Sequence, residues 1–274
     1  MRTFEGRGIM IDTRVIRAMR CLARILWNKL TVLAGMGVLL CGAAAAQLVI
    51  GPTVIEFGPK QKVAAVSVTL DSNAAMPMRL QAEVLVWRQT VKGENVYDDT
   101  TELLVTPPIA EIKPGQKQIF RLAMRGARAA PEELAYRLVL EDISAVMGTA
   151  QVAPNMKVDF RMRYDLPVLL APVSPVANRV LWKPCKADTL ISAKQTAACI
   201  HLLNAGNRRV KIQTLTVVGD GWQQPLAFGD GENILAGAER EWRIPLQASQ
   251  TGRFRSVQAQ TARGETLQLE PGEF

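Results

Sequence analysis

The chain has 274 residues and a formal net charge of +8, and 48% of its residues are hydrophobic. The first 46 residues hold six Arg and one Lys against one Glu and one Asp, a net charge of +5, so residues 47–274 carry only +3. A nucleic-acid-binding protein would concentrate its positive charge in one stripe, whereas here the charge is spread among acidic residues. Nucleic acid is therefore not an expected partner.

The N-terminal stretch, residues 1–46, is predicted to be a cleaved signal peptide. Several arginines precede the apolar run LTVLAGMGVLLCGAAAA, and Ala44 and Ala46 supply the small residues that signal peptidase needs. Gln47 is the predicted mature N-terminus. Two alternatives stay open: a transmembrane anchor, for which about 17 apolar residues is the lower limit, and a lipid attached at Cys41. The preferred prediction is export from the cytoplasm, without stable membrane insertion of the mature chain; the resemblance described below implies the periplasm.

Two cysteines remain in the predicted mature chain, Cys185 and Cys199. Export places them where disulfides persist, and a disulfide between them would be worth roughly 3 kcal/mol in the chain-entropy model. Two buried free thiols are the alternative. The chain has no Cys-x-x-Cys motif, so redox catalysis is not expected.

Short runs of alternating apolar and polar residues dominate the first half of the mature chain. They are QLVIGPTVIEF, VAAVSVTL, RLQAEVLVWRQT, QIFRLAMR and AYRLVLEDI. Turn residues separate these runs, notably the pairs Pro107–Pro108 and Pro114–Gly115, and no long amphipathic helix intervenes. Several short strands at this spacing predict an all-β fold built as a β-sandwich.

The longest alternating run is NMKVDFRMRYDLPVLLAP, residues 155–172. Its period of two predicts a single strand with one apolar face and one charged face. The residues of the apolar face are Met156, Val158, Phe160, Met162, Tyr164 and Leu166. This face either covers the protein's own core or is offered to another chain.

The pattern is interrupted by APVSPVAN, residues 171–178, which predicts a short, stiff connector. Alternation then resumes in RVLWKP, ACIHLLNAG, RVKIQTLTVVG, REWRIPLQ and FRSVQAQT. We therefore expect two β-sandwich domains, at residues 47–172 and 173–274.

The residues needed for catalysis are missing from the sequence. His201 is the single histidine and lies in an apolar run, where packing is the expected role, and the chain has no G-x-S-x-G or H-E-x-x-H motif. The segment GDGENI at 229–234 lacks the acidic spacing of a calcium loop, so a plain turn is expected there. Neighbouring carboxylates such as Glu132–Glu133 are expected to be solvated. We predict no enzymatic activity, no metal and no cofactor.

Five segments together resemble the periplasmic chaperones of the chaperone–usher pilus pathway. They are PTVIEF, QAEVLVW, TPPIAEIKPGQKQIFRL, AYRLVLEDI and LPVLLAP. The last two are most similar to the archaic branch, and the likeness covers most of residues 47–172. The resemblance implies two immunoglobulin-like domains in a boomerang arrangement. It also implies that the protein binds pilus or fimbrial subunits and delivers them to an outer-membrane usher. A secreted two-domain adhesin or structural pilus component is the alternative.

The resemblance gives the long alternating run a function, because in this family the last strand of the first domain completes a subunit that lacks a strand. Strand donation of this kind is a recognised mode of β-augmentation. The donated residues would be Met156, Val158, Phe160 and Met162, while Tyr164 and Leu166 would stay in the protein's own core. The alternative is that all six side chains pack in their own domain.

The resemblance also implies an anchor for the carboxylate at the subunit's C-terminus. Two basic residues form this anchor in the better-known branch of the family, and this sequence has Val54 and Pro167 at those positions. Resemblance to the archaic branch points to Arg137 instead, since Arg can hold a carboxylate through two parallel hydrogen bonds. The alternative is an Arg on the exposed face of its strand.

Overall fold

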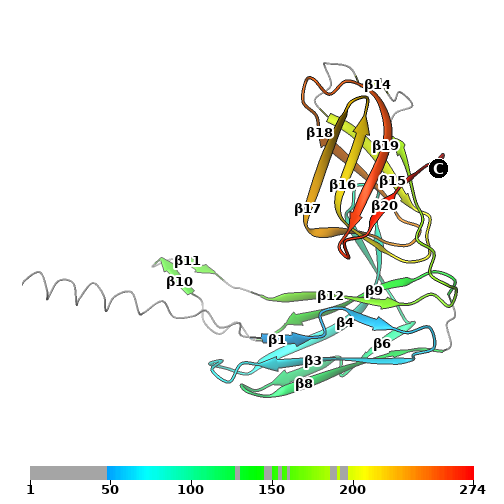
Figure 1. Ribbon diagram of the computed structural model, residues 1–274. Coiled ribbons are helices and arrows are strands. Elements are labelled where there is room, and N and C mark those ends of the chain that lie inside the picture. The colour runs from blue at the N-terminus through cyan, green and yellow to red at the C-terminus, as the bar shows by residue number, and fades with distance from the viewer. Residues whose placement is uncertain are drawn as a thin grey trace, which may run out of the picture. The chain divides into compact units, whose positions relative to one another are not determined.

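The computed structural model describes residues 48–126, 130–144, 150–153, 156–158, 161–185, 190–191 and 197–274. Side chains are described for these residues except 150–153, 156–158, 190–191 and 254. All regular structure in them is β-strand, which confirms the predicted all-β fold (Figure 1). In this part of the chain no helix has the length and apolar character needed to cross a membrane.

The first β-sandwich is built from two sheets. One has the strand order β1-β3-β8-β6, and the other has the order β2-β12-β9-β4-β5, with β7 also paired to β4. Their bounds are β1 Leu48–Gly51, β2 Ile55–Phe57, β3 Val63–Leu70, β4 Met78–Gln89, β5 Asn95–Asp99, β6 Leu103–Thr106, β7 Ile109–Ile112, β8 Lys117–Met124, β9 Leu134–Asp142 and β12 Arg163–Leu170. Alternate residues of these strands, apart from β5, point into one core, as the period of two predicts. Phe57, Phe120 and Leu138 are among its fully buried members.

Prolines divide the chain between the two sheets of this sandwich. The chain passes from β1, which pairs antiparallel with β3, to β2, which pairs parallel with β12, and Pro52 lies between them. Pro107–Pro108 separates β6 from β7 in the same way. Proline lacks the N–H that a ladder needs, so a strand that reaches one can leave its sheet there. Pro107–Pro108 and Pro114–Gly115 were predicted to interrupt strand pairing, and each lies between two strands of the structure.

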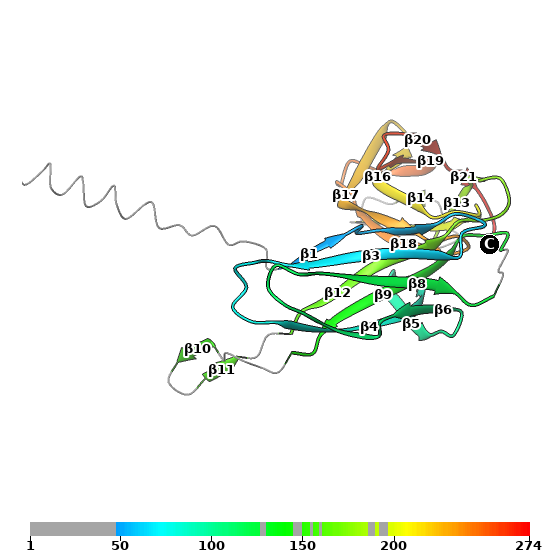
Figure 2. The ribbon, with the colours of Figure 1, turned by 90° about the horizontal axis from the view of Figure 1, so that it is seen from below.

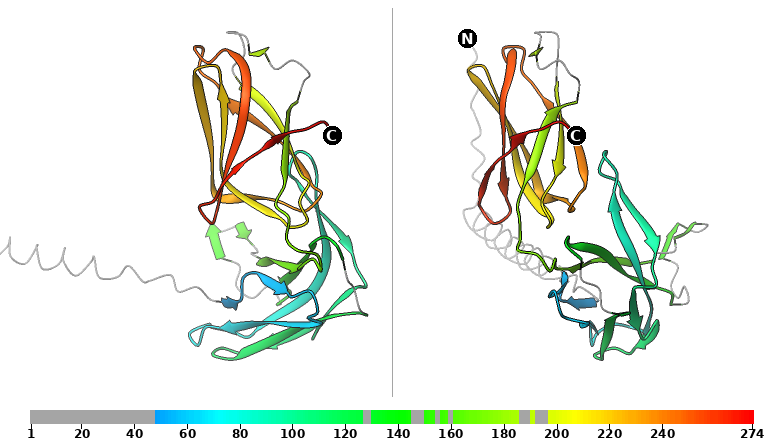
Figure 3. Two further views of the ribbon diagram at one scale, coloured as in Figure 1. Left: turned by 45° about the vertical axis from the view of Figure 1, so that its right-hand side comes forward. Right: turned by 90° about the vertical axis from the view of Figure 1, so that its right-hand side faces the viewer.

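The second β-sandwich has its own core, which includes Ile200, Leu215 and Val257 (Figure 3, yellow to red). Its sheets have the orders β18-β15-β13-β21 and β14-β19-β16-β17, with β20 paired to β19. The bounds are β13 Val180–Pro184, β14 Leu190–Ile191, β15 Ala197–Asn204, β16 Val210–Gly219, β17 Trp222–Ile234, β18 Glu239–Pro245, β19 Gly252–Thr261, β20 Thr266–Gln268 and β21 Glu270–Pro271. The five alternating runs of the second half are thus β13, β15, β16, β18 and β19.

The long alternating run at residues 155–172 is not one strand. It is divided into β11, Met156–Val158, and β12, which begins at Arg163. β11 pairs antiparallel with β10, Ala150–Ala153, as a separate two-stranded sheet that Figures 1 and 2 draw apart from both sandwiches. Alternation specifies which side chains share a face but not which strand is the neighbour, so the division was not predictable from it.

The segment GDGENI is also not a plain turn. Residues 229–234 lie inside β17, at a register irregularity between β16 and β17, where Ala227 pairs with Thr214 but Glu232 pairs with Ile212. Gly231 has a φ of 81°, which suits glycine. The glycines therefore serve a β-bulge within a strand, and the turn follows later.

The connector at 171–178 is held by Asn207, in the turn between β15 and β16. The Asn207 side chain accepts a hydrogen bond from the Ala177 N–H at 2.8 Å and donates to the Pro175 carbonyl at 3.0 Å. Gly206 permits this close approach, since a Cβ there would lie 2.4 Å from the Ala177 carbonyl oxygen. The connector is therefore hydrogen-bonded to the second sandwich, and the stiffness expected from its prolines stays a prediction.

Candidate functional site

A cavity of about 330 Å³ is lined by residues of both sandwiches. Val54, Arg137 and Pro167 line it from the first sandwich, and the turn before β16, the start of β16 and the turn after β19 line it from the second. The resemblance aligned Val54 and Pro167 with the two anchor positions of the better-known branch, and it pointed to Arg137 as the substitute. The structure brings them together although they are far apart in the sequence.

Arg137 lies on β9 between Leu85 of β4 and Pro167 of β12. Its guanidinium carbon lies 3.8 Å from the centre of the Trp87 ring, and its Nη1 donates a long hydrogen bond of 3.3 Å to the Asp165 carbonyl. The pKa of Arg137 is lowered, mainly because the guanidinium is buried, although Tyr97 and Asp165 act in the opposite direction. The Nε atom is buried and finds no acceptor among the described residues. Arg137 therefore retains donors for a carboxylate.

Two of the cationic residues at the cavity are already neutralised by carboxylates of the first sandwich. Glu133 accepts hydrogen bonds from the Arg209 N–H and from Arg209 Nη1, both at 3.0 Å, and lies 3.5 Å from Arg208 Nε. Glu56 accepts from Arg209 Nη2 at 2.9 Å and lies 3.7 Å from Arg208 Nη2. The hydrogen bond from Arg209 is the main cause that lowers the pKa of Glu56. The four side chains form a network that joins the sandwiches.

The remaining charges at the cavity are mainly positive. Arg137, Lys211 and Arg263 line it, against the single carboxylate of Glu265. None of these four side chains forms an ion pair with another described residue. A concave wall with excess positive charge raises the local concentration of anions. The cavity therefore suits a small anionic group such as a carboxylate.

Residues proposed for strand donation are only partly described. Met156 and Val158 lie on β11, Met162 lies just before β12 with half of its surface exposed, and Phe160 lies outside the described residues. The Met162 carbonyl accepts a hydrogen bond from the Asp142 N–H at 2.9 Å, so the ladder with β9 extends to this point. Their donation role stays a prediction.

Tyr164 and Leu166 both contact the core of the first sandwich. Leu166 is 8% exposed and Tyr164 is half-buried. The predicted apolar face thus turns into the protein's own core from Tyr164 onward.

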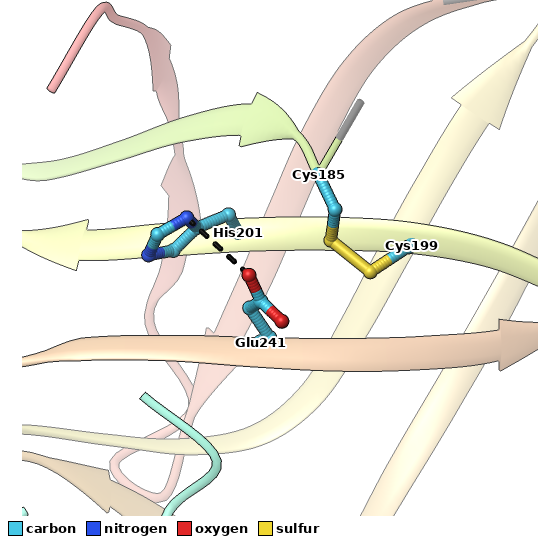
Figure 4. Close-up of a disulfide and its surroundings, with 4 residues drawn as sticks. All are labelled: Cys185, Cys199, His201 and Glu241. Carbon is cyan, nitrogen blue, oxygen red and sulfur yellow. Dashed lines mark ion pairs between the residues drawn. A yellow bond between two sulfur atoms is a disulfide. The ribbon is translucent and has the colours of Figure 1, made fainter. Parts of the chain in front are cut away.

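The disulfide and the histidine lie together in the second sandwich. Cys185 and Cys199 form a disulfide with a Cα–Cα distance of 5.4 Å. His201 is near it, with Nδ1 3.7 Å from Glu241 Oε1 (Figure 4) and Nε2 2.7 Å from Glu239 Oε2. Its ring meets Phe274 edge-on at 5.1 Å. The histidine is packed within its sheet, which is the role expected for it.

Two residues at the site were missed by the reasoning from sequence. Glu133 was expected to be solvated, but its side chain is 3% exposed and is paired with Arg209. Trp87 was predicted only to be part of an alternating strand, whereas its ring stacks against the Arg137 guanidinium. A partial signal existed for Trp87, since a large aromatic residue two positions from Leu85 shares a strand face with it.

The fold and site define a class: all-β proteins with two immunoglobulin-like sandwiches and a cationic cavity lined by both. Residues 47–175 match the family model of the PapD N-terminal domain, described as a pili and flagellar-assembly chaperone. The match covers the first sandwich and part of the connector, which is less than half of the chain. No curated protein matches it at a significant level.

Solved structures share the fold at low sequence identity. A chain of the CsuC–CsuE chaperone–tip adhesion subunit pre-assembly complex, from archaic chaperone–usher Csu pili of Acinetobacter baumannii, has a TM-score of 0.61 and 18% identity. The match covers 83% of this chain and 100% of that one. The class 5 fimbriae chaperone CfaA has a TM-score of 0.54 and 14% identity over the same shares. A chain of the Salmonella enterica SafA pilin–SafB chaperone complex has a TM-score of 0.50 and 14% identity over 80% and 92%. The chain therefore has the fold of chaperone–usher pilus chaperones.

Proposed function

We propose that the protein captures incomplete pilus or fimbrial subunits by donor-strand complementation. The observation that carries the proposal is the placement of Val54, Pro167 and Arg137 around one cationic cavity, next to a strand that continues an apolar alternating segment. The match of residues 47–175 to the chaperone family model supports it. The similar Csu and Saf chaperones are in complexes with a tip adhesion subunit and a pilin, respectively.

The physical problem that such a chaperone solves is an unfinished sandwich. A sandwich that lacks a strand exposes a hydrophobic groove and unpaired backbone groups, which promote aggregation. A donated strand pairs those groups and fills the groove with every second side chain. Val158, Phe160 and Met162 would contribute on the order of 5–9 kcal/mol gross on burial, before the costs of association. Methionines at 156 and 162 adapt to grooves of varied shape.

Register is fixed, in this proposal, by Arg137. A client strand that slips by two residues still presents the same face, so apolar pairing alone does not fix where it starts. Arg137 lines the cavity and makes one long hydrogen bond to a described residue, so a C-terminal carboxylate would supply acceptors for its remaining N–H groups. Bidentate pairing between Arg and a carboxylate is directional and therefore sets one end of the client.

The direct test is Phe160→Asp, with Arg161→Asp as the matched control. Residue 161 is the next position along the run and belongs to its opposite face, so both variants place a new carboxylate on the same segment. The net charge changes by −2 in the control and by −1 in Phe160→Asp, so an effect of charge alone would be larger in the control. Each variant is co-expressed with a pilus subunit that lacks its last strand, and complexes are isolated through a tag on the chaperone. We expect Phe160→Asp to stay folded and lose the subunit, and Arg161→Asp to retain it. Equal recovery of the subunit with both variants would contradict the proposal.

The cellular setting follows from the same proposal. Chaperones of this kind act in the periplasm, so residues 1–46, which lie outside the described residues, would be the export signal. The mature chain would form two domains, 47–172 and 173–274, belong to the archaic branch and deliver its client to an outer-membrane usher. The fate of residues 1–46 is tested by N-terminal sequencing of the secreted protein, with Gln47 as the expected first residue.

A further inference from the structure

We infer that Trp87 is a positioning residue, whose ring orients the Arg137 guanidinium for binding a carboxylate. We also infer that contacts from the second sandwich fix the orientation of the Trp87 ring. The inference rests on the proposed anchor role of Arg137. It adds a residue that acts by orienting Arg137 and that lines the same cavity, and it gives the second sandwich a part in recognising the client's terminus.

The stacking geometry is suited to orienting a guanidinium without consuming its donors. Arg137 and Trp87 lie on the adjacent strands β9 and β4, with the guanidinium carbon 3.8 Å from the ring centre. A guanidinium stacked on an aromatic face keeps its N–H groups pointing outward in its own plane. One of them makes the long bond to the Asp165 carbonyl, and the buried Nε–H has no acceptor in the described part of the chain. The stack therefore fixes the plane and leaves donors for an incoming carboxylate.

The Trp87 ring is itself fixed by contacts on several sides. It is 4% exposed, its Nε1 donates a hydrogen bond to Asn95 Oδ1 at 2.8 Å, and it packs in a small buried cluster with Leu169 and Leu235. Leu169 belongs to β12 of the first sandwich, and Leu235 follows β17 of the second. A ring held in this way has little freedom to rotate away from Arg137.

Gln89 ties the same strand to the second sandwich two residues beyond Trp87. Its Nε2 donates to the Asn233 carbonyl at 2.9 Å, and its Oε1 accepts the Leu235 N–H at 3.0 Å. The Glu241 N–H adds a bond to the Val91 carbonyl at 2.8 Å. Leu235 is thus held against the indole by hydrogen bonds on its own backbone. The second sandwich therefore supports the platform on which Arg137 lies.

The test separates recognition of the carboxylate from every other contribution to binding. The probe is a fluorescently labelled peptide of about ten residues, with alternating Val and Thr and lysines at its start, made once with a free C-terminal carboxylate and once as the amide. Fluorescence polarisation with the mature chain gives two dissociation constants. Their ratio measures how much the carboxylate contributes, because the rest of the peptide is the same.

We expect Arg137→Ala to bring this ratio to about one. Trp87→Leu should lower the ratio by roughly tenfold, the scale of a desolvated cation–π contact, while Trp87→Phe keeps the ratio within about threefold because it retains an aromatic face. Leu235→Ala should lower the ratio by about threefold, since it loosens the ring without touching Arg137. Trp242→Leu is the control, because Trp242 lies in the second sandwich and does not line the cavity.

The outcomes distinguish the two levels of the argument. A normal ratio in Trp87→Leu, together with a ratio of about one in Arg137→Ala, overturns the role of Trp87 and leaves the anchor standing. A normal ratio in Arg137→Ala overturns the anchor and the inference with it. Should Trp87→Leu fail to fold, Leu235→Ala decides, and an unchanged ratio in that variant contradicts the inference.

Discussion

Glu133→Ala tests whether the ion-pair network joins the two sandwiches. The Glu133 side chain is 3% exposed and accepts two hydrogen bonds from Arg209, one from the backbone N–H and one from the guanidinium. Its own N–H donates to the Asn207 carbonyl at 2.8 Å. Glu133 therefore contacts the turn before β16 with both its side chain and its backbone.

The expected cost follows from what the substitution leaves behind. Removing one partner of a buried ion pair costs about 3–5 kcal/mol when the other charge is left uncompensated. Here Arg209 is 18% exposed and keeps Glu56 at 2.9 Å, so its charge is only partly stranded. We therefore expect about 2–3 kcal/mol, which includes the unpaired Arg209 N–H. Glu132→Ala, at the exposed neighbouring position, should cost less than about 0.5 kcal/mol.

The assay is equilibrium urea denaturation, followed by tryptophan fluorescence and far-UV circular dichroism. For a chain of this size the slope is about 2–3 kcal/mol per molar urea, so Glu133→Ala should lower the midpoint by roughly 1 M. A double-mutant cycle with Arg209→Ala should give a coupling energy of about 1–3 kcal/mol. Midpoints of Glu133→Ala and Glu132→Ala that agree within about 0.2 M would refute the reasoning.

Three further predictions concern stability. The Arg209 hydrogen bond lowers the pKa of Glu56, so the stability from this pair is present above the unfolded-state pKa near 4.5 and is lost as the pH falls through the lower folded-state pKa. Because Glu56 is largely exposed, Glu56→Gln should cost less than about 1 kcal/mol at pH 7 and nothing at a pH below the folded-state pKa, measured by urea denaturation at both. Gly206→Ala should cost more than about 1 kcal/mol because its Cβ would meet the Ala177 carbonyl at 2.4 Å, while Gly229→Ala, with open space around it, should cost less; equal midpoints would contradict this. Replacing both cysteines of the Cys185–Cys199 disulfide by Ser should cost roughly 3 kcal/mol, and addition of reductant should then have no further effect.

The alternating runs were enough to predict most strands of both sandwiches. β3, β4, β8 and β9 in the first sandwich and β15, β16 and β19 in the second coincide with runs in which every second residue is apolar. Each of these strands has one face in a core and one face directed outward. Because successive side chains point to opposite faces, apolar and polar residues alternate in the sequence. Prolines marked the breaks because they remove a ladder hydrogen bond.

Two predictions about strands were wrong because the alternation of residues shows which face a side chain occupies but not which strand lies next to it. Residues 156–166 alternate without a break, yet β11 pairs with β10, while β12 pairs with β9 and β2. The segment 229–234 carries turn residues, yet it is a bulge in β17. Pairing is set by the topology of the whole sheet, which a local pattern does not contain.

The candidate site was predictable only in part. Resemblance to the chaperone family pointed to Arg137, and the structure adds that it lies in a cavity with Val54 and Pro167. Glu133 and Trp87 escaped prediction because their roles depend on partners, Arg209 and Leu235, that lie more than 70 residues away in the chain. The strand pattern shows that Trp87 shares a face with Leu85, but no local pattern shows that its contacts, or those of Glu133, cross from one sandwich to the other.

Amide hydrogen exchange on the mature chain, alone and bound to a pilus subunit that lacks a strand, tests the central claim most directly. The account predicts that binding protects backbone amides throughout residues 156–162, because a donated strand gives them partners in the client. Protection confined to the outer face of β1-β3-β8-β6, with residues 156–162 exchanging as in the free chain, would contradict the account.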